Sequence, residues 1–355
     1  MSDGGAAPAR RIYVTDCEGP LTRNDNAQEI AARFLPDGAD FFARLSRYDD
    51  FLADVLRMPG YNAGDTLRLL PPFLKAFEVT DEAVELFSAE GVLTVPGALE
   101  ALDHIRARLP ASIISTSYTP YLKALCLVSG FPFARVRCTE LSLDAWDMPA
   151  DERAWLRDEA GRIMERSLIE IPEGAPSASD LTAGDAVTVA RLDDLFWTQM
   201  AGRVSGEMLA AVRPVGGGMK LAALEELVAA EGVAGDGVMY VGDSITDAPA
   251  LAAVRAWGGV SLSFNGNGYA LAAAEFAAAS PDAEVEARLA EAFATGGREA
   301  VEAAVRGWPK AKEGARPGGP ARARVGLTAE EPEALAEASA AARLSVRGER
   351  VARLG

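Results

Sequence analysis

The chain has 355 residues, of which 49% are apolar and 25% are charged, so it can bury at least one full-size core together with a cap or insert. Its formal net charge of −17 excludes a broad basic surface that would bind nucleic acid nonspecifically. The first ten residues are polar and small, and no apolar run approaches the roughly 20 residues that span a bilayer. We therefore expect a cytoplasmic protein with neither a nucleic-acid nor a membrane partner.

The few cysteines and the single histidine limit the available chemistry further. Cys17, Cys126 and Cys138 have neither zinc-type spacing nor the dense, even pattern of a secreted scaffold, which favours a reducing compartment and a packing role. His104 is the only histidine, so one chain cannot assemble a histidine-based triad or a two-histidine metal site.

The N-terminal part predicts a buried strand followed by a helical insert. Ile12 to Val14 form a short apolar run that ends at Asp16 and a Gly-Pro turn, as expected of a strand that enters a loop. From residue 24 to about residue 91, apolar residues recur every three or four positions. These helical segments are Ile30–Leu35, Phe41–Leu56, Leu67–Phe77 and Val84–Phe87.

The middle of the chain returns to alternating elements and then contains a second insert. Up to residue 139 we expect a helix from Val95 to Arg108, a strand Ala111–Ile114, a helix Tyr121–Val128 and a strand Ala134–Cys138. Residues 140–215 are longer than a simple connection needs. They contain a helix over Asp151–Leu168, a polar stretch over Pro172–Gly184 and a helix over Leu192–Met200. Their pattern leaves open whether they complete the cap or form a homodimer contact.

The last third predicts a parallel, doubly wound α/β sheet. Its expected elements are a helix Met219–Glu231, a strand Val238–Val241, a helix Thr246–Val254 and a strand Gly259–Phe264. Pro309 to Arg324 is rich in Gly, Pro and Ala and predicts a linker, while Thr328 with Glu331 has the spacing of a capping box before a helix from Leu335 onward. We therefore assign the core to 1–23, 92–139 and 216–306, the helical cap to 24–91, the second insert to 140–215, and a linker with a helix to 307–355.

Polar residues stand where these strands end, at the edge of a parallel sheet that binds ligands. Asp16 and Glu18 follow the first strand, Ser115 follows the second, Lys220 opens a helix after three glycines, and Asp243 and Asp247 follow Val238–Val241. Each alone could be an acidic turn, a helix cap or a solvated surface residue. Their common position at strand ends predicts one shared site.

In this order, the residues resemble the four motifs of the haloacid dehalogenase superfamily. Within that superfamily, the resemblance is to the phosphoserine-phosphatase-like members. The strongest pieces are Tyr13-Val14-Thr15-Asp16-Cys17-Glu18-Gly19 and Val241-Gly242-Asp243-Ser244-Ile245-Thr246-Asp247. The Asp-Cys-Glu-Gly-Pro segment, followed by Asn24-Asp25-Asn26-Ala27, also resembles a group of predicted phosphohydrolases labelled energy-converting hydrogenase A subunit R. That label indicates genomic association more than chemistry.

The resemblance implies a Mg²⁺-dependent phosphatase that hydrolyses a small phosphorylated metabolite through an aspartyl-phosphate. Asp16 would be the nucleophile, Glu18 the general acid, and Lys220 a catalytic cation. The implied magnesium ligands are Asp16, the backbone carbonyl of Glu18, and Asp243, with Asp247 ligating or orienting. The implied phosphate-binding residues are Ser115, Thr116, Lys220, Cys17 and Gly19.

One departure from the commonest pattern keeps two other functions open. That pattern has aspartate two positions after the nucleophile, and Glu18 carries an extra methylene that moves the carboxyl by roughly 1 Å. A phosphotransferase or mutase, or a non-catalytic accessory subunit of a larger complex, therefore remain alternatives. The cap also contains five candidate anion contacts, for which surface ion pairs are the competing interpretation. These are Arg23, Arg44, Arg47, Arg57 and Arg68.

Overall fold

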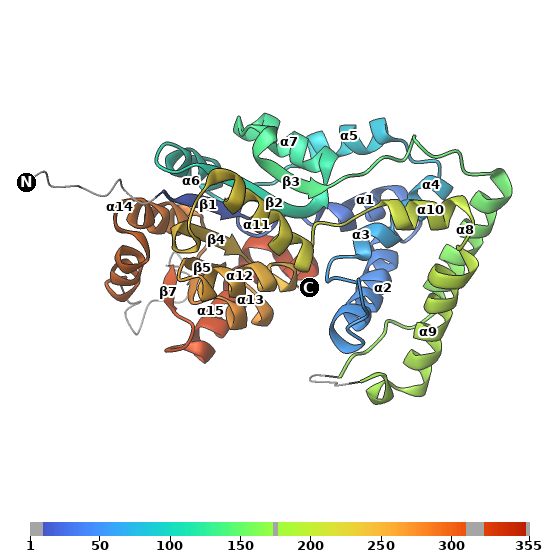
Figure 1. The fold of residues 1–355 in the computed structure, drawn as a ribbon. Helices are drawn as coiled ribbons and strands as arrows, with labels where there is room; N and C mark the ends of the chain where they lie inside the picture. Colours follow the sequence, from blue (N-terminus) through green and yellow to red (C-terminus); the bar gives the residue numbers. More distant parts are fainter. Residues whose placement is uncertain (1–9, 173–176, 310–322, 353–355) are drawn as a thin grey trace, which may run out of the picture.

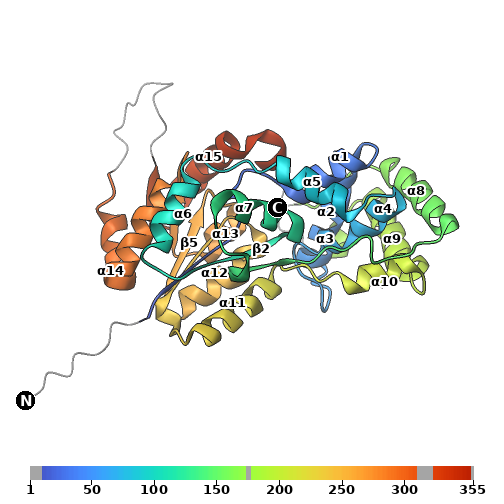
Figure 2. The same cartoon turned by 90° about the horizontal axis from the view of Figure 1, so that it is seen from above.

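The structure is a computed structural model, and it describes residues 10–172, 177–309 and 323–352 (Figure 1). A seven-stranded sheet in the order β3-β2-β1-β4-β5-β6-β7 organises one lobe, and a helical lobe lies beside it (Figures 1 and 2). The strands are β1 (Ile12–Thr15), β2 (Ala111–Tyr118), β3 (Val136–Thr139), β4 (Val238–Gly242), β5 (Val260–Phe264), β6 (Phe276–Ala279) and β7 (Arg324–Leu327). All neighbouring strands are parallel except β6 and β7, so the predicted doubly wound α/β fold is confirmed.

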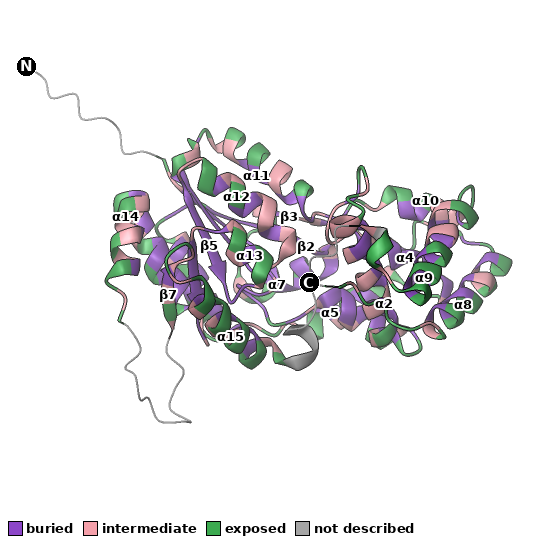
Figure 3. Cartoon of the chain, turned by 90° about the horizontal axis from the view of Figure 1, so that it is seen from below, coloured by how far each residue is buried: buried purple, intermediate pink, exposed green. Residues whose placement is uncertain are grey.

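Both faces of the sheet are covered by helices, as parallel strands require. Alternate residues of β1 show this directly, because Tyr13 packs into one hydrophobic cluster while Ile12 and Val14 pack into the other. One face carries α6 (Ala98–Arg106), α7 (Thr119–Ser129) and α14 (Glu284–Arg306). The opposite face carries α11 (Gly218–Glu231), α12 (Ala248–Ala256) and α13 (Gly268–Ala273). The strand interiors are accordingly buried (Figure 3).

The helical lobe is built from both inserts, which share one hydrophobic core. The first insert forms α1 (Asn26–Phe34), α2 (Gly38–Asp50), a π-helical turn (Phe51–Val55), α3 (Thr66–Leu69), α4 (Pro71–Ala76) and α5 (Asp81–Glu90). The second forms α8 (Ala150–Met164), α9 (Ala183–Asp193), a π-helical turn (Asp194–Gln199) and α10 (Val204–Ala211). Because α8 packs on α2 and α4, and α10 packs on α3 and α4, the second insert completes the cap.

Two predicted strands have different bounds in the structure. The second strand continues to Tyr118, so Ser115 lies within β2 and does not follow it. Its pairing with β3 is irregular between Ile114 and Tyr118, and this irregularity carries the strand past the expected end. Residues 133–135 form a 3-10 turn, and β3 therefore begins only at Val136.

The C-terminal segment departs most from expectation. Residues 310–322 of the predicted linker lie outside the described residues, as do 173–176 of the polar stretch. Arg324, however, begins β7, which pairs antiparallel with β6. The predicted capping box is wrong: the Thr328 hydroxyl donates to the carbonyl of Ala274, and the Glu331 amide donates to the carbonyl of Leu327. The helix that follows, α15 (Pro332–Ala352), packs on β6 and β7.

Within the described ranges, none of the helices combines the length and the apolar character needed to cross a bilayer.

Candidate active site

An open cavity of about 770 Å³ lies where the strand order of the sheet reverses, between β1 and β4. In doubly wound sheets this point leaves a crevice at the carboxyl ends of the strands. Thr15 and Val241 are paired in register, and the Asp16 amide donates to the Val241 carbonyl over 2.9 Å. Asp16 and Asp243, which follow these strands, are therefore brought to the same wall of the cavity.

A buried lysine joins two of the predicted site carboxylates. The Lys220 ammonium lies 2.6 Å from Asp16 Oδ2 and 2.7 Å from Asp247 Oδ1. Its side chain is fully buried, so its charge is balanced by these carboxylates and not by water. The two carboxylates raise the pKa of Lys220 against the opposing effect of burial, which keeps the ammonium charged. Burial raises the pKa of Asp16, and the adjacent ammonium opposes that rise.

Asp247 is held by a network that uses both of its oxygens. Oδ1 also accepts from the Tyr240 hydroxyl, and Oδ2 accepts from the amides of Asp243 and Ser244. The glycine before this loop is required, because a Cβ on Gly242 would lie 2.4 Å from the Asp247 carboxyl carbon. Asp247 is therefore committed to orienting Lys220 and the loop after β4.

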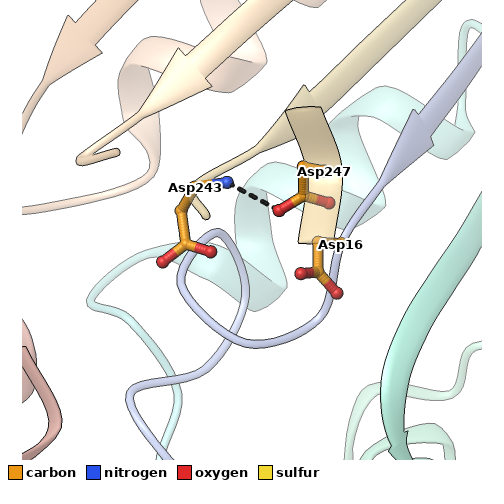
Figure 4. Close-up of side chains that lie close together, drawn as sticks. All are labelled: Asp16, Asp243 and Asp247. Carbon is orange, nitrogen blue, oxygen red and sulfur yellow. Dashed lines mark hydrogen bonds between the residues drawn. The ribbon is translucent and has the colours of Figure 1, made fainter. Parts of the chain in front are cut away.

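The carboxylates form an oxygen-donor cluster that suits a hard divalent cation. One oxygen from each of Asp16, Asp243 and Asp247 lies within 4.8 Å of the others, and all three residues are buried (Figure 4). Such oxygen sets suit Mg²⁺. Asp247 accepts hydrogen bonds from more partners than Asp16 or Asp243 does, so these two are the better candidate ligands. Gly19 has a φ of 105°, and a Cβ there would lie 2.3 Å from Asp243, so the first loop packs directly against this cluster.

Glu18 faces the same cavity from the loop after β1. Its Oε1 accepts a hydrogen bond from the Asn26 amide over 2.8 Å, and Asn26 is the first residue of α1. The longer side chain of Glu18 is therefore held by the first helix of the cap. Burial, with a further contribution from Asp25, raises the pKa of Glu18 to about 8. At neutral pH the carboxyl is therefore mostly protonated, as a general acid must be.

The predicted phosphate-binding residues are close by, but several of their polar atoms have intramolecular partners. Ser115, Thr116 and Ser117 line the cavity from β2. The Ser115 hydroxyl accepts from the Ser117 amide, and the Thr116 hydroxyl donates to the Val215 carbonyl. The Cys17 amide donates to Asp16 Oδ1 over 2.6 Å, so it positions the nucleophile candidate.

The cap covers the cavity with acidic, small and apolar residues. Its contribution is Asp25, Ala27, Phe42, Ser46, Asp49, Asp50, Gly64, Thr66 and Leu67. The cap touches the core at a loop tip, where the Gly218 amide donates to Asn62 Oδ1 over 3.2 Å. None of the five predicted cap arginines lines this cavity. Arg47 pairs with Asp50, as the ion-pair interpretation predicts, whereas Arg44 donates to the Arg166 carbonyl.

Two arginines that sequence reasoning missed line the cavity from α15. Arg347 lies 2.9 Å from Asp243 Oδ2 and donates to the Asn24 carbonyl over 2.6 Å. Arg343 pairs with the same Asp243 oxygen. Their spacing of four residues places them on one helical face, and this was the only signal in the sequence. That signal could not indicate what the face contacts, because α15 follows β7 at the edge of the sheet and reaches the site only through the folding of the whole chain.

The sheet order and the cap inserted after β1 agree with the doubly wound α/β fold that the resemblance to haloacid dehalogenases implies. Among solved structures, the AF1437 gene product of Archaeoglobus fulgidus is similar over 98% of this chain and 99% of that chain, with 29% identity and a TM-score of 0.81. Both inserts and α15 therefore belong to an arrangement that another protein shares. No family model matches the chain, and no curated protein matches it.

Two further solved structures are similar at lower scores. A substrate-bound phosphoserine phosphatase complex has a TM-score of 0.46 and 14% identity, covering 76% of this chain and 93% of that chain. A HAD family hydrolase from Salmonella enterica serovar Typhi has a TM-score of 0.43 and 14% identity, covering 75% of this chain and 66% of that chain. The narrower resemblance to the hydrogenase-labelled group stays a prediction.

Proposed function

We propose that this chain is a Mg²⁺-dependent phosphatase that hydrolyses a small phosphomonoester. The observation that carries the proposal is the buried Lys220 ammonium, which contacts both Asp16 and Asp247 beneath a cavity that Glu18 also lines. An accidental acidic turn would not position a fully buried lysine between two carboxylates, because burying these charges is unfavourable without a specific arrangement.

In the first half of the reaction, an Asp16 oxygen attacks phosphorus and the bond to the leaving oxygen breaks. Glu18 donates its proton to that oxygen, so the substrate leaves as an alcohol and an aspartyl-phosphate remains. Lys220 would stabilise charge on the phosphoryl oxygens. When bound by Asp16 and Asp243, Mg²⁺ supplies charge neutralisation of the phosphate.

In the second half, the Glu18 carboxylate takes a proton from a water molecule that attacks phosphorus. The bond to Asp16 breaks, inorganic phosphate leaves, and both carboxyl groups return to their starting states. The cap keeps bulk water from the aspartyl-phosphate, with Asn62 and Gly218 joining its loop to the core.

The direct test is phosphate release from a panel of small phosphomonoesters, measured with Mg²⁺ and again with EDTA. We expect metal-dependent turnover that Asp16→Asn abolishes. Asp103→Asn is the matched control, because Asp103 is 71% exposed and its ion pair among the described residues is with Arg106 on the surface. Turnover that survives Asp16→Asn or EDTA would contradict this mechanism.

The same preparation separates the two alternatives. A phosphotransferase would divert the phosphoryl group from water to an added acceptor alcohol. A non-catalytic subunit would release no phosphate from any substrate and would form no trapped phosphoaspartate analogue with beryllium fluoride.

A further inference from the structure

The cavity is strongly acidic, and its positive charge comes from the C-terminal helix. Six carboxyl groups line it, on Asp16, Glu18, Asp25, Asp49, Asp50 and Asp243. Among the described residues that line it, only Arg343 and Arg347 are cationic. Lys220 lies behind Asp16 and is already paired twice. An anionic ligand that enters the cavity therefore meets these two guanidinium groups as its first positive charges.

The two arginines are held in place by a shared carboxylate. Both contact Oδ2 of Asp243. Their side chains are each only 6% exposed. Arg347 also donates to the Asn24 carbonyl, where the chain leaves the core for the cap, and this contact fixes the direction of its planar group.

The helix that carries them is an integral part of the core. Leu335 and Val346 are buried, and the preceding β7 adds a hydrogen-bonded edge to the sheet. Because α15 is anchored through Leu335 and Val346, both guanidinium groups are presented from the part of the helix before its kink at Gly348. Planar, fixed guanidinium groups bind phosphate and carboxylate oxygens through paired hydrogen bonds.

We propose that Arg343 and Arg347 are substrate-binding residues that hold anionic oxygens of the ligand in this cavity. These oxygens belong either to the transferred phosphoryl group or to a second anionic group on the leaving part. The inference rests on the proposed phosphatase function for its substrate, but its anion-binding test needs no turnover.

The experiment measures inorganic phosphate binding by calorimetry, with Mg²⁺ present, in the full chain and in Arg343→Met and Arg347→Met. If the arginines hold the phosphoryl group, each variant weakens phosphate binding roughly tenfold to a hundredfold. The lysine variants Arg343→Lys and Arg347→Lys retain the charge and should recover part of the affinity. Arg324→Met is the control, since Arg324 pairs with Glu331 away from the cavity.

A second arm compares KM for phosphomonoesters with and without an additional carboxylate. If the arginines hold that second group, phosphate binding is unchanged while the KM preference for the carboxylated substrate disappears in the Met variants. The proposal is overturned if folded Arg→Met variants, as judged by thermal unfolding, change neither phosphate affinity nor this preference. Normal phosphate binding without any hydrolysis would instead contradict only the phosphatase function.

Discussion

At the scale of single residues, the site depends on buried charges that compensate one another. Lys220 is fully buried between Asp16 and Asp247, and removing it would leave two carboxylates close together without a cation. Breaking a buried ion pair by removing one partner is strongly destabilising, because the remaining charge stays desolvated. We therefore expect Lys220 to matter for stability and, if the proposed function holds, for catalysis.

We expect Lys220→Met to reduce kcat/KM at least a hundredfold and to lower the free energy of unfolding by about 3 kcal/mol. Denaturant unfolding and phosphate release measure the two effects on one preparation. Lys123→Met, at a half-exposed lysine near Glu85, should change neither. Unchanged stability in Lys220→Met would contradict the buried ion-pair network.

Glu18 sets the expected pH dependence of the first chemical step. Its pKa is raised to about 8 chiefly by burial, and the protonated form is the one that donates to the leaving oxygen. As pH rises through about 8, this form is lost and the rate of the first step should fall. Stopped-flow measurement of alcohol release from pH 6 to 9.5 would reveal the decline. Glu18→Gln should lower that rate on the order of 100-fold or more and remove the alkaline decline.

At the scale of elements, the tip of the first cap insert contacts the wall of the cavity. Gly64 has a φ of 93°, and a Cβ there would lie 3.0 Å from a Thr116 methyl group and 3.1 Å from one of Thr246. Gly60, in the same loop, has a φ of 76° but no atom within 4 Å of such a Cβ. A substitution at Gly60 therefore introduces backbone strain alone, whereas one at Gly64 introduces backbone strain together with contact with the core.

Gly64→Ala should lower kcat/KM roughly tenfold or more, because the added methyl group would clash with the Thr116 and Thr246 methyl groups and shift the cap loop away from β2 and the loop after β4. Gly60→Ala imposes a similar strain of about 1 kcal/mol on the backbone without that clash, so its kinetics should remain near those of the parent chain. Steady-state kinetics and thermal unfolding on both variants make the comparison. Equal kinetic losses would mean that loop strain, and not cap closure, is responsible.

At the scale of the whole molecule, a carboxyl group far from the cavity makes stability depend on pH. Glu286 on α14 is buried against β1, where its Oε2 accepts from the Tyr13 hydroxyl over 2.7 Å. Its Oε1 has no hydrogen-bond partner among the described residues. Burial raises its pKa from 4.5 to about 8, so the folded state retains a proton that the unfolded chain has already released.

Between roughly pH 4.5 and 8 this group makes the folded state progressively less stable as pH rises, by up to about 1.4 kcal/mol per pH unit. Glu286→Gln keeps an acceptor for Tyr13 but cannot ionise. Its free energy of unfolding should therefore depend less on pH across this window. At pH 8 the variant should have a larger free energy of unfolding than the parent chain. Urea unfolding at pH 5, 6.5 and 8 tests this, and identical pH slopes would contradict it.

Local residue patterns were sufficient to predict the first five of the seven strands, most helices and the polar residues of the core site, but not β6 and β7. Short apolar runs, each followed by an acidic or glycine-rich turn, mark where parallel strands end, and such ends must converge at one edge of the sheet. This is why Asp16, Glu18, Lys220, Asp243 and Asp247 could be grouped before their distances were known.

Only the tertiary structure decided which distant segments complete the cap and the cavity. Residues 140–215 read locally as helices with no stated partner, and their packing on the first insert depends on surfaces that meet only after folding. The spacing of Arg343 and Arg347 predicts a shared helical face, yet the Asp243 carboxylate they contact is about a hundred residues away in the chain. Periodicity reports local conformation, whereas the partners of a charged face are set by long-range packing.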